Sequence, residues 1–418
     1  MSVISASTDS VSAAAASGDA PASGIAVRAD IVRSWEDVRA FEGAWDALAE
    51  RSGAEISSFP GYARTWWTHY GRGRLAVVVC RRGDRLVGVL PMFVERVGPW
   101  PIGARVAKLM GSDSTIAVMS PAVEPEHAAE SIASAVRELV ERDGCDVVHL
   151  GPMQGDTGAA GAVREALGGG LRERRVGVLT RWDLPGTFEE YLASLEKSER
   201  SNLKRNLNKI GKASGSKVRV VRDAEEIVAA MDRFVPMHAK QWEAEGKPGH
   251  FGDWRGSEAF AREAVREQSK RGRVAFVEQE IEGECVCSYW SYVVVGAGSG
   301  RAYWRLPARE VGEKWDAYAL GRVGLVMMLR ELIGMGVRYV DGGPGHYDYK
   351  LRLGATEHPL VSFMFVKAGW ASRARASLLT RWADLVHLVY YRAWRLKFGP
   401  RVKWKSGALR RVWVRSRV

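Results

Sequence analysis

The chain has 418 residues, of which 46% are hydrophobic and 26% are charged. This length exceeds one ordinary hydrophobic core, so we expect two domains, and the composition excludes a collagen-like, a wholly disordered and a polytopic membrane protein. The four Cys are scattered and lack zinc-finger spacing with His partners, which argues against a disulfide framework and against a metal site. A reducing cytoplasm is the expected compartment.

The net charge of +12 is concentrated at one end of the chain. From Trp370 onward there are 13 Lys plus Arg and one acid, Asp384, so the rest of the sequence is neutral. A nucleic-acid-binding enzyme usually carries its basic residues on its fold, so the neutral body argues against a nucleic-acid partner. We interpret residues 369–418 as a basic, Trp- and Arg-rich helical tail.

The first half of the chain predicts a mixed αβ unit. Residues 1–24 are rich in Ser, Ala and Gly and predict a disordered leader. The expected strands of the following unit, 25–183, are 25–31, 75–80, 85–94, 146–150 and 171–183. Its expected helices are 35–48, one after Pro60, 126–142 and 158–167.

A similar order of elements returns in residues 184–368, which suggests a duplicated architecture. The expected helices are 188–195, 198–212, 224–245, 257–270 and 321–334. The expected strands are 217–221, 273–279, 284–295, 301–306 and 338–341. The predicted fold class is therefore α+β, with mixed sheets covered by helices.

A glycine-punctuated turn opens the expected helix at 321–334. The free N–H groups of such a helix start favour a phosphate, and Arg322 beside Gly321 and Gly324 would add a side-chain contact. Two glycines flanking an Arg also fit plain helix entry and close packing, so both interpretations stay open. The spacing is neither a P-loop nor a dinucleotide fingerprint, which argues against an ATPase and a dehydrogenase.

The densest polar cluster, residues 341–350, follows the last expected strand. In open α/β sheets, ligands meet the protein at such strand ends. His346 would accept a proton, Asp341 would orient it, Tyr349 would donate one, and Lys350 would stabilise an oxyanion or a phosphate. The alternative is a tight turn with an exposed His and Lys.

Several of these segments resemble a known family. Residues 303–306, 320–321, 336, 339–341, 345 and 349–350 resemble the C-terminal signature of the CelD-like acetyltransferases, a branch of the GNAT superfamily associated with bacterial polysaccharide synthesis. Residues 201–207 resemble that family's basic Ser/Arg/Asn helix, and His238, Trp242 and Gly246 follow as in the family. The resemblance covers about residues 25–367, and the family is similar to FemAB-type aminoacyl transferases with two tandem GNAT-like domains.

The resemblance implies two tandem GNAT-like domains, 25–183 and a catalytic one at 184–368. It also implies transfer from acetyl-CoA or another acyl-CoA to an amine or hydroxyl, with the pyrophosphate on the helix start at Leu320 and Gly321 and with Lys350 at the acyl centre. The chain departs from the family at Gln241, where Arg is common, and lacks the superfamily's usual Gly-x-Gly or Gly-x-Ala coenzyme A loop.

The expected mechanism is direct transfer in a ternary complex. Backbone N–H groups on the strand before Leu306 would hold the thioester, while His346 or a water that it orients takes the acceptor's proton. Lys350 would stabilise the tetrahedral oxyanion.

The acceptor side is predicted from the basic helix and from the family match. Arg200 and Arg205 would grip an anionic acceptor or the adenosine phosphate, or else form a solvated helix face. His238, Trp242 and Tyr303 are the other candidate substrate contacts.

In the tail, Trp residues alternate with cations, and an apolar stripe falls on one helical face. The stripe consists of Leu378, Trp382, Leu385, Val389 and Leu396. Arg with Trp suits an anionic membrane interface or stacking on RNA. The neutral body and the family's envelope chemistry favour the membrane, which would place the protein at the inner face of the bilayer.

The predicted function is an acyltransferase that acts on a polar or saccharide-type acceptor in polysaccharide or cell-envelope metabolism. One alternative is a catalytically silent GNAT-fold binding module of a synthase complex, and another is a FemAB-like, aminoacyl-tRNA-dependent transferase. The sequence leaves the acyl group, the acceptor, the pathway and the oligomeric state open.

Overall fold

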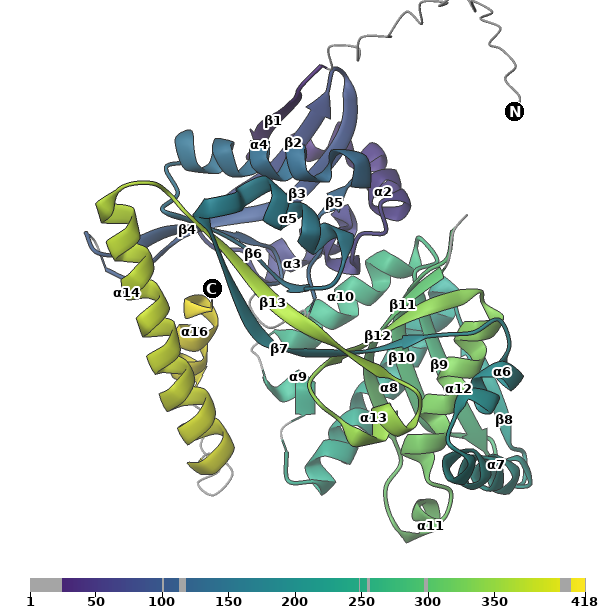
Figure 1. Ribbon diagram of the computed structural model, residues 1–418. Coiled ribbons are helices and arrows are strands. Elements are labelled where there is room, and N and C mark those ends of the chain that lie inside the picture. The colour runs from purple at the N-terminus through teal and green to yellow at the C-terminus, as the bar shows by residue number, and fades with distance from the viewer. Residues whose placement is uncertain are drawn as a thin grey trace, which may run out of the picture.

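The computed structural model describes residues 25–99, 101–112, 118–247, 249–253, 256–296, 300–398 and 407–417. The predicted leader at 1–24 lies outside the described residues. The strands form one continuous mixed sheet that runs through two helix-covered lobes (Figure 1). The strand order is β1-β2-β3-β4-β6-β13-β7-β12-β11-β10-β9-β8, with β5 beside β3. The predicted mixed αβ fold class is confirmed.

The first lobe, purple to blue in Figure 1, contains the N-terminal strands and five helices. Its strands are β1 (Val27–Val32), β2 (Arg74–Arg82), β3 (Arg85–Val97), β4 (Ala104–Leu109), β5 (Ala122–Val123) and β6 (Val147–Gln154). Its helices are α1 (Trp35–Arg39), α2 (Glu42–Arg51), α3 (Pro60–Tyr70), α4 (Ala128–Glu141) and α5 (Gly158–Leu167), with short 3₁₀ turns η1 (Ile56–Ser58) and η2 (Pro125–His127). The Ser34 hydroxyl accepts from the Asp37 N–H and caps α1. The strand β4 was not predicted.

The second lobe, teal to green in Figure 1, holds five strands and most of the remaining helices. The strands are β8 (Lys217–Val221), β9 (Val274–Ile281), β10 (Glu284–Val294), β11 (Gly300–Arg309) and β12 (Val337–Pro344). The helices are α6 (Phe188–Ser194), α7 (Lys197–Gly211), α8 (Ala224–Ala244), α9 (Gly249–Asp253), α10 (Ser257–Ser269), α11 (Glu313–Asp316), α12 (Leu320–Gly334) and α13 (Asp348–Arg352). The helix α12 is buried along most of its length and packs against β9, β10 and β11.

Two long strands join the lobes. The strand β7 (Leu171–Asp183) pairs with β12 of the second lobe, and β13 (Thr356–Val366) pairs with both β6 and β7. Figure 1 shows both strands running between the lobes. The strand β13 was not predicted, because its partners lie about 200 residues earlier in the chain. As a result, β7 carries Thr180 into the second lobe, next to β12.

The parallel pair β11–β12 separates partway along its length. The two strands are paired from Gly300 to Tyr303 and from Val337 to Asp341. Beyond these residues the described pairing of β11 is with β10, while β12 bulges and pairs with β7. A Cβ atom on Gly342, within the bulge, would lie 2.6 Å from the Trp182 ring, so this position requires glycine. The separation opens a wedge between the two strands.

The described part of the tail is helical and packs on the first lobe. It comprises α14 (Trp370–Val386), a π-helical continuation (His387–Phe398) and α16 (Gly407–Ser416). Ala376 and Leu379 on α14 pack in a cluster with Val97, Val106 and other buried residues of the sheet. In α16, Trp413 is buried against Tyr390 and Val386.

Candidate active site

A cleft of about 290 Å³ opens in the second lobe, beside the wedge between β11 and β12. It brings together the start of α12, the end of β11 and the short helix α13. Its lining residues are Glu199, Gln241, Tyr289, Trp304, Pro307, Arg309, Gly321, Arg322, Tyr349, Arg352 and Leu353. The helix start and the polar bend after β12, which the sequence analysis linked, therefore border the same cleft.

One end of this cleft is strongly cationic. Arg309, Arg322 and Arg352 come from three different elements, and Glu199 of α7 is the one carboxylate in the lining. Glu199 forms an ion pair with Arg322. No described side chain caps α12, whose N-cap residue Ala319 has φ 51°. Three guanidinium groups next to uncapped helix N–H groups suit a phosphate.

Buried polar atoms of the cleft wall lack partners. Gln241 Oε1, Trp304 Nε1 and Arg322 Nε have no hydrogen-bond partner among the described residues. Buried polar groups are nearly always hydrogen-bonded, so these three atoms around one cleft are available to a polar ligand. Gln241 stands where the resembling family commonly carries Arg, and it offers an amide in place of a charge.

Lys350 lies at the base of the wedge. Its side chain is almost fully buried, with 4% of the residue exposed. Its ammonium donates to the Gly342 carbonyl at 2.5 Å and to Thr180 Oγ1 at 3.3 Å, and it lies 5.0 Å from the centre of the Trp304 ring. Burial lowers the pKa of Lys350 to about 8, although the Asp341 carboxylate opposes this change. The wedge therefore holds a desolvated cation beside the cleft wall.

Tyr349 and His346 occupy different environments. Tyr349 lines the cleft with 44% of its surface exposed, and its partial burial, followed by the neighbouring Tyr347, raises its pKa to about 12. His346 is exposed, and its ring nitrogens contact Glu357 Oε1 at 2.6 Å and Asp348 Oδ1 at 3.1 Å. The bond to Glu357 raises the pKa of His346, so its imidazole favours the charged form. The carboxylates next to His346 are thus Glu357 and Asp348.

Asp341 belongs to a buried acidic pair at the junction of the lobes. Its Oδ1 accepts from the Gly343 N–H at 2.6 Å, and burial raises its pKa. Glu55 of the first lobe is also buried, and burial together with the Asp341 charge raises its pKa. Tyr303 and Arg301 of β11 donate to the carbonyls of the two residues before Glu55. The first lobe therefore places a second carboxyl behind the wedge.

The candidate cofactor contacts fall into two groups. Gly321 and Arg322 line the cleft, whereas Leu320 is buried in the core. A Cβ on Gly324 would lie 2.5 Å from both Cys287 Sγ and the Tyr289 ring, so close packing accounts for this glycine. Leu306, on the diverging part of β11, packs against the large core cluster.

The candidate acceptor contacts lie around the cleft rather than in its lining. On α7, Arg200 donates to the Ala193 carbonyl and Arg205 to the Asn202 side chain. His238 Nδ1 contacts the carbonyl of Pro307, a cleft residue, at 2.7 Å, and Trp242 packs on the His238 ring. Tyr303 joins the lobes through its hydroxyl.

Eight cleft residues were not predicted as site residues: Glu199, Gln241, Tyr289, Trp304, Pro307, Arg309, Arg352 and Leu353. Two of them had a visible signal. Glu199 is the acid of an otherwise basic helix, and Gln241 is the departure from the family pattern.

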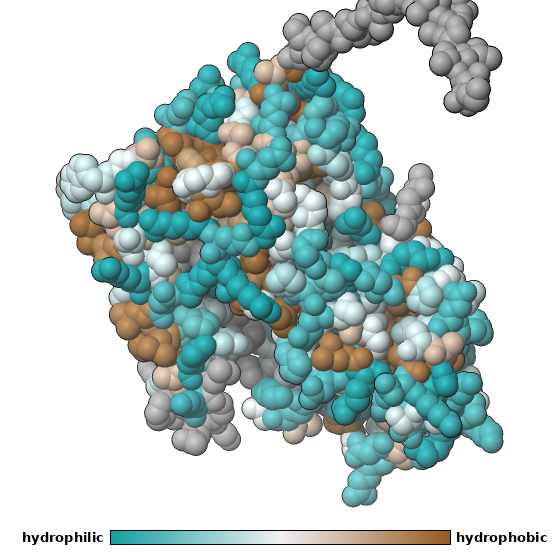
Figure 2. Space-filling view, viewed as in Figure 1, coloured by the Kyte–Doolittle hydropathy of each residue, from teal (hydrophilic) through white to brown (hydrophobic). Residues whose placement is uncertain are grey.

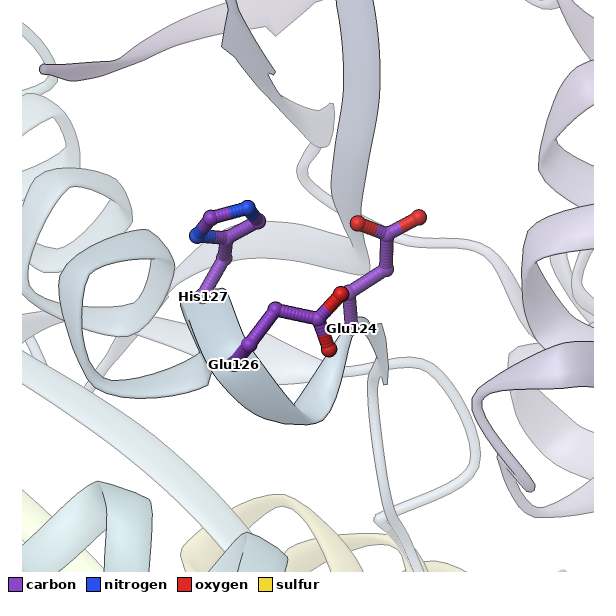
Figure 3. Close-up of side chains that lie close together, drawn as sticks. All are labelled: Glu124, Glu126 and His127. Carbon is purple, nitrogen blue, oxygen red and sulfur yellow. The ribbon is translucent and has the colours of Figure 1, made fainter. Parts of the chain in front are cut away.

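A group of possible metal ligands lies in the first lobe, away from this cleft. Glu124, Glu126 and His127, at η2, have donor atoms within 4.8 Å of one another (Figure 3). The Glu124 carboxylate, however, accepts from Arg85 at 2.8 Å and from Arg51 at 3.0 Å. These guanidinium groups hold the pKa of Glu124 below its usual range despite burial. The two arginines already supply the positive charge that a cation would bring, so the group carries no metal assignment.

A family of known proteins matches part of this chain. Residues 197–351 match the model of the acetyltransferase (GNAT) domain family. The second lobe carries a GNAT-type acetyltransferase domain. The matched range includes the start of α12, Lys350 and every cleft residue except Arg352 and Leu353. The protein is an acyltransferase.

Solved structures are similar to this chain over most of its length, and the structure of FemX shares its fold. The crystal structure of FemX is 12% identical, covers 78% of this chain and 96% of its own, and has a TM-score of 0.57. L-PGS from Bacillus licheniformis is 11% identical over 80% of this chain and 95% of its own, with a TM-score of 0.49. A tandem GNAT protein from the clavulanic acid biosynthesis pathway is 14% identical over 82% of this chain and all of its own, with a TM-score of 0.41. No curated protein matches the sequence.

Proposed function

We propose that this protein transfers an acyl group from an acyl-CoA, such as acetyl-CoA, to an amine or hydroxyl of a polar or saccharide-type acceptor. The observation that carries the proposal is the cleft, which joins an arginine-rich helix start to Trp304 and Tyr349, with the buried Lys350 ammonium 5.0 Å from the centre of the Trp304 ring. A thioester with a diphosphate needs an anion site at one end and a charge-stabilising donor at the other.

The cleft supplies the groups that this substrate requires. Arg309, Arg322 and Arg352, with the N–H groups at the start of α12, would hold the diphosphate. The free edge of β11 after Tyr303 would bind the amides of the substrate's arm, and Trp304 would cover them. Glu199 would release Arg322 when a phosphate competes for the guanidinium.

The chemical step needs an oxyanion donor, a proton acceptor and a proton donor. The acceptor nitrogen or oxygen attacks the thioester carbonyl and loses its proton, the C–S bond breaks, and the leaving sulfur takes up a proton. We assign the oxyanion contact to the Lys350 ammonium and protonation of the sulfur to Tyr349, which lines the cleft.

Asp341 suits the proton acceptor better than His346. It lies at the last paired position before the wedge opens, and burial makes its carboxylate more basic than usual. His346 is exposed and is held between two carboxylates, which favours its protonated form. Direct transfer through Asp341 requires no covalent acyl-enzyme.

We place the acceptor in polysaccharide or cell-envelope metabolism, on the resemblance to CelD-like acetyltransferases. The FemAB-like alternative, transfer from aminoacyl-tRNA, is supported by the likeness of the fold to FemX. The arginine-lined cleft favours a thioester substrate, because its three guanidinium groups would pair with the diphosphate of coenzyme A.

The experiment is to follow release of the coenzyme A thiol from acetyl-CoA in the presence of a panel of amino sugars, polyols and saccharide lipids. The proposal predicts acceptor-dependent release, with Lys350→Met as the inactive control. Transfer from aminoacyl-tRNA without any acyl-CoA turnover would contradict it.

A further inference from the structure

The outward face of α14 and its continuation is apolar and has no covering element among the described residues. Two Trp and four aliphatic side chains share this face, and each is about half exposed or more. They are Trp370, Leu378, Trp382, Leu385, Leu388 and Val389. We call this set the α14 stripe. Figure 2 shows hydrophobic residues among hydrophilic ones over α14, at the left of the molecule. Trp370 is 85% exposed, which is unusual for so large an apolar side chain.

The opposite face of α14 fixes the helix to the first lobe. Its buried residues are Ser372, Ala376, Leu379, Ala383 and Val386, which alternate with the stripe at helical spacing. Ser372 Oγ donates to Asp146 Oδ1 at 2.7 Å, and Arg375 Nη1 donates to the same oxygen at 3.2 Å. The stripe is therefore presented on a fixed helix, in a defined orientation.

The charges that border the stripe are almost all positive. Arg373, Arg381 and Arg392 are exposed, and the described residues offer them no carboxylate partner. Asp384, the tail's one acid, forms an ion pair with Arg174 at 2.6 Å. An occupant of this surface must therefore be apolar at its centre and anionic around it.

We propose that the α14 stripe docks on the surface of an anionic lipid bilayer. Trp and Leu side chains on one face of a helix bury among acyl chains, while bordering Arg residues contact lipid phosphates. Within the described residues no helix has the length and hydropathy needed to cross a bilayer, and the helix would lie parallel to the surface.

Other occupants fit the surface less well. A second copy would bring the cations around one stripe against those around the other, which like-charge repulsion opposes. Single-stranded RNA would use the arginines and aromatic rings, but it would leave Leu378, Leu385, Leu388 and Val389 without a role. The proposal is independent of acyl transfer, because none of these residues borders the cleft.

The test is co-sedimentation of the full chain with vesicles of phosphatidylglycerol and phosphatidylcholine, compared with vesicles of phosphatidylcholine alone. We expect binding to the anionic vesicles, and about a tenfold loss of affinity for Trp382→Ser with Leu385→Ser. The double variant Arg381→Gln, Arg392→Gln should lose about fivefold per Arg, because each cation near an anionic surface contributes that factor.

The matched controls are Val228→Ser, an exposed apolar residue on α8, and Arg28→Gln, an exposed cation on β1. Both should bind vesicles as the parent does. Point variants are sharper than truncation, because removing α14 would also take Ala376 and Leu379 out of the core. The melting temperature and the retained acyl transfer of each variant show that it is folded.

Three results would overturn the proposal. The first is undiminished vesicle binding by both double variants. The second is a parent protein that does not bind vesicles but forms a dimer in sedimentation velocity, which the Trp382 and Leu385 changes dissociate. The third is stripe-dependent binding of single-stranded RNA without vesicle binding.

Discussion

Replacing Lys350 by Met tests whether its ammonium acts in catalysis or only stabilises the fold. A pKa near 8 in place of the ordinary 10.5 means that the fold disfavours the charged form by roughly 3 kcal/mol. The variant removes this penalty but leaves the Gly342 carbonyl without its donor, which costs about 1–3 kcal/mol. We therefore expect the free energy of unfolding to change by less than about 2 kcal/mol. Loss of an oxyanion donor should lower kcat by about 10²- to 10³-fold.

The assay pairs thiol release with chemical denaturation at pH 7. The parent should also lose activity above about pH 8, where Lys350 gives up its proton. In Lys350→Arg this loss of activity should begin at a higher pH, because a guanidinium stays charged. Because the pKa of Lys350 is lowered in the folded state, the charged side chain destabilises the fold fully below pH 8, and this penalty fades towards pH 10.5. The stability that the Met variant gains by losing this penalty should fade over the same pH range, which leaves the cost of the unpaired Gly342 carbonyl. A Met variant that loses several kcal/mol of stability but keeps its turnover would refute the catalytic assignment.

Three further predictions concern the cleft and its supports. Arg322→Gln should weaken coenzyme A binding by about tenfold or more. Glu199→Gln should strengthen it, because the Arg322 guanidinium then has no competing carboxylate. Calorimetric titration measures both affinities, and a change of the same sign in the two variants would count against a phosphate site. Gly324→Ala should lower the free energy of unfolding by about 1–3 kcal/mol, because the added methyl group would clash with Cys287 and Tyr289. Gly334→Ala, which has open space on the same helix, should be neutral or stabilising. Equal melting temperatures for the two variants would contradict the packing explanation. Asp341→Asn should reduce kcat by about 10²-fold or more, and His346→Ala should leave kcat nearly unchanged. Steady-state kinetics with a matched acceptor measure both. A larger loss for His346→Ala than for Asp341→Asn would indicate that His346 is the proton acceptor.

Local periodicity predicted most elements of this fold. The apolar spacing of α4, α8 and α12 and the turn between β2 and β3 are properties of short segments, and the structure has them close to the predicted bounds. The stripe positions Leu378, Trp382, Leu385 and Val389 are exposed on one side, as the sequence pattern indicates. Leu396 is outside the side chains that the structure describes.

Features that depend on distant pairing could not be predicted. The run 356–366 becomes β13 because β6 and β7 provide its partners, and no local signal identifies them. The environment of Lys350 likewise depends on Thr180, 170 residues earlier in the chain. The sequence also placed Asp341 beside His346, whereas the bulge at Gly342 and Gly343 turns the chain so that Asp341 faces Glu55 and Lys350 instead.

The most direct test of acyl-CoA binding in this cleft is a crystal structure of the protein with coenzyme A. We predict that the diphosphate lies at the start of α12, in contact with Arg322, and that the sulfur lies near Trp304 and Lys350. Coenzyme A bound elsewhere, or with its sulfur far from Lys350, would contradict the assignment of the active site.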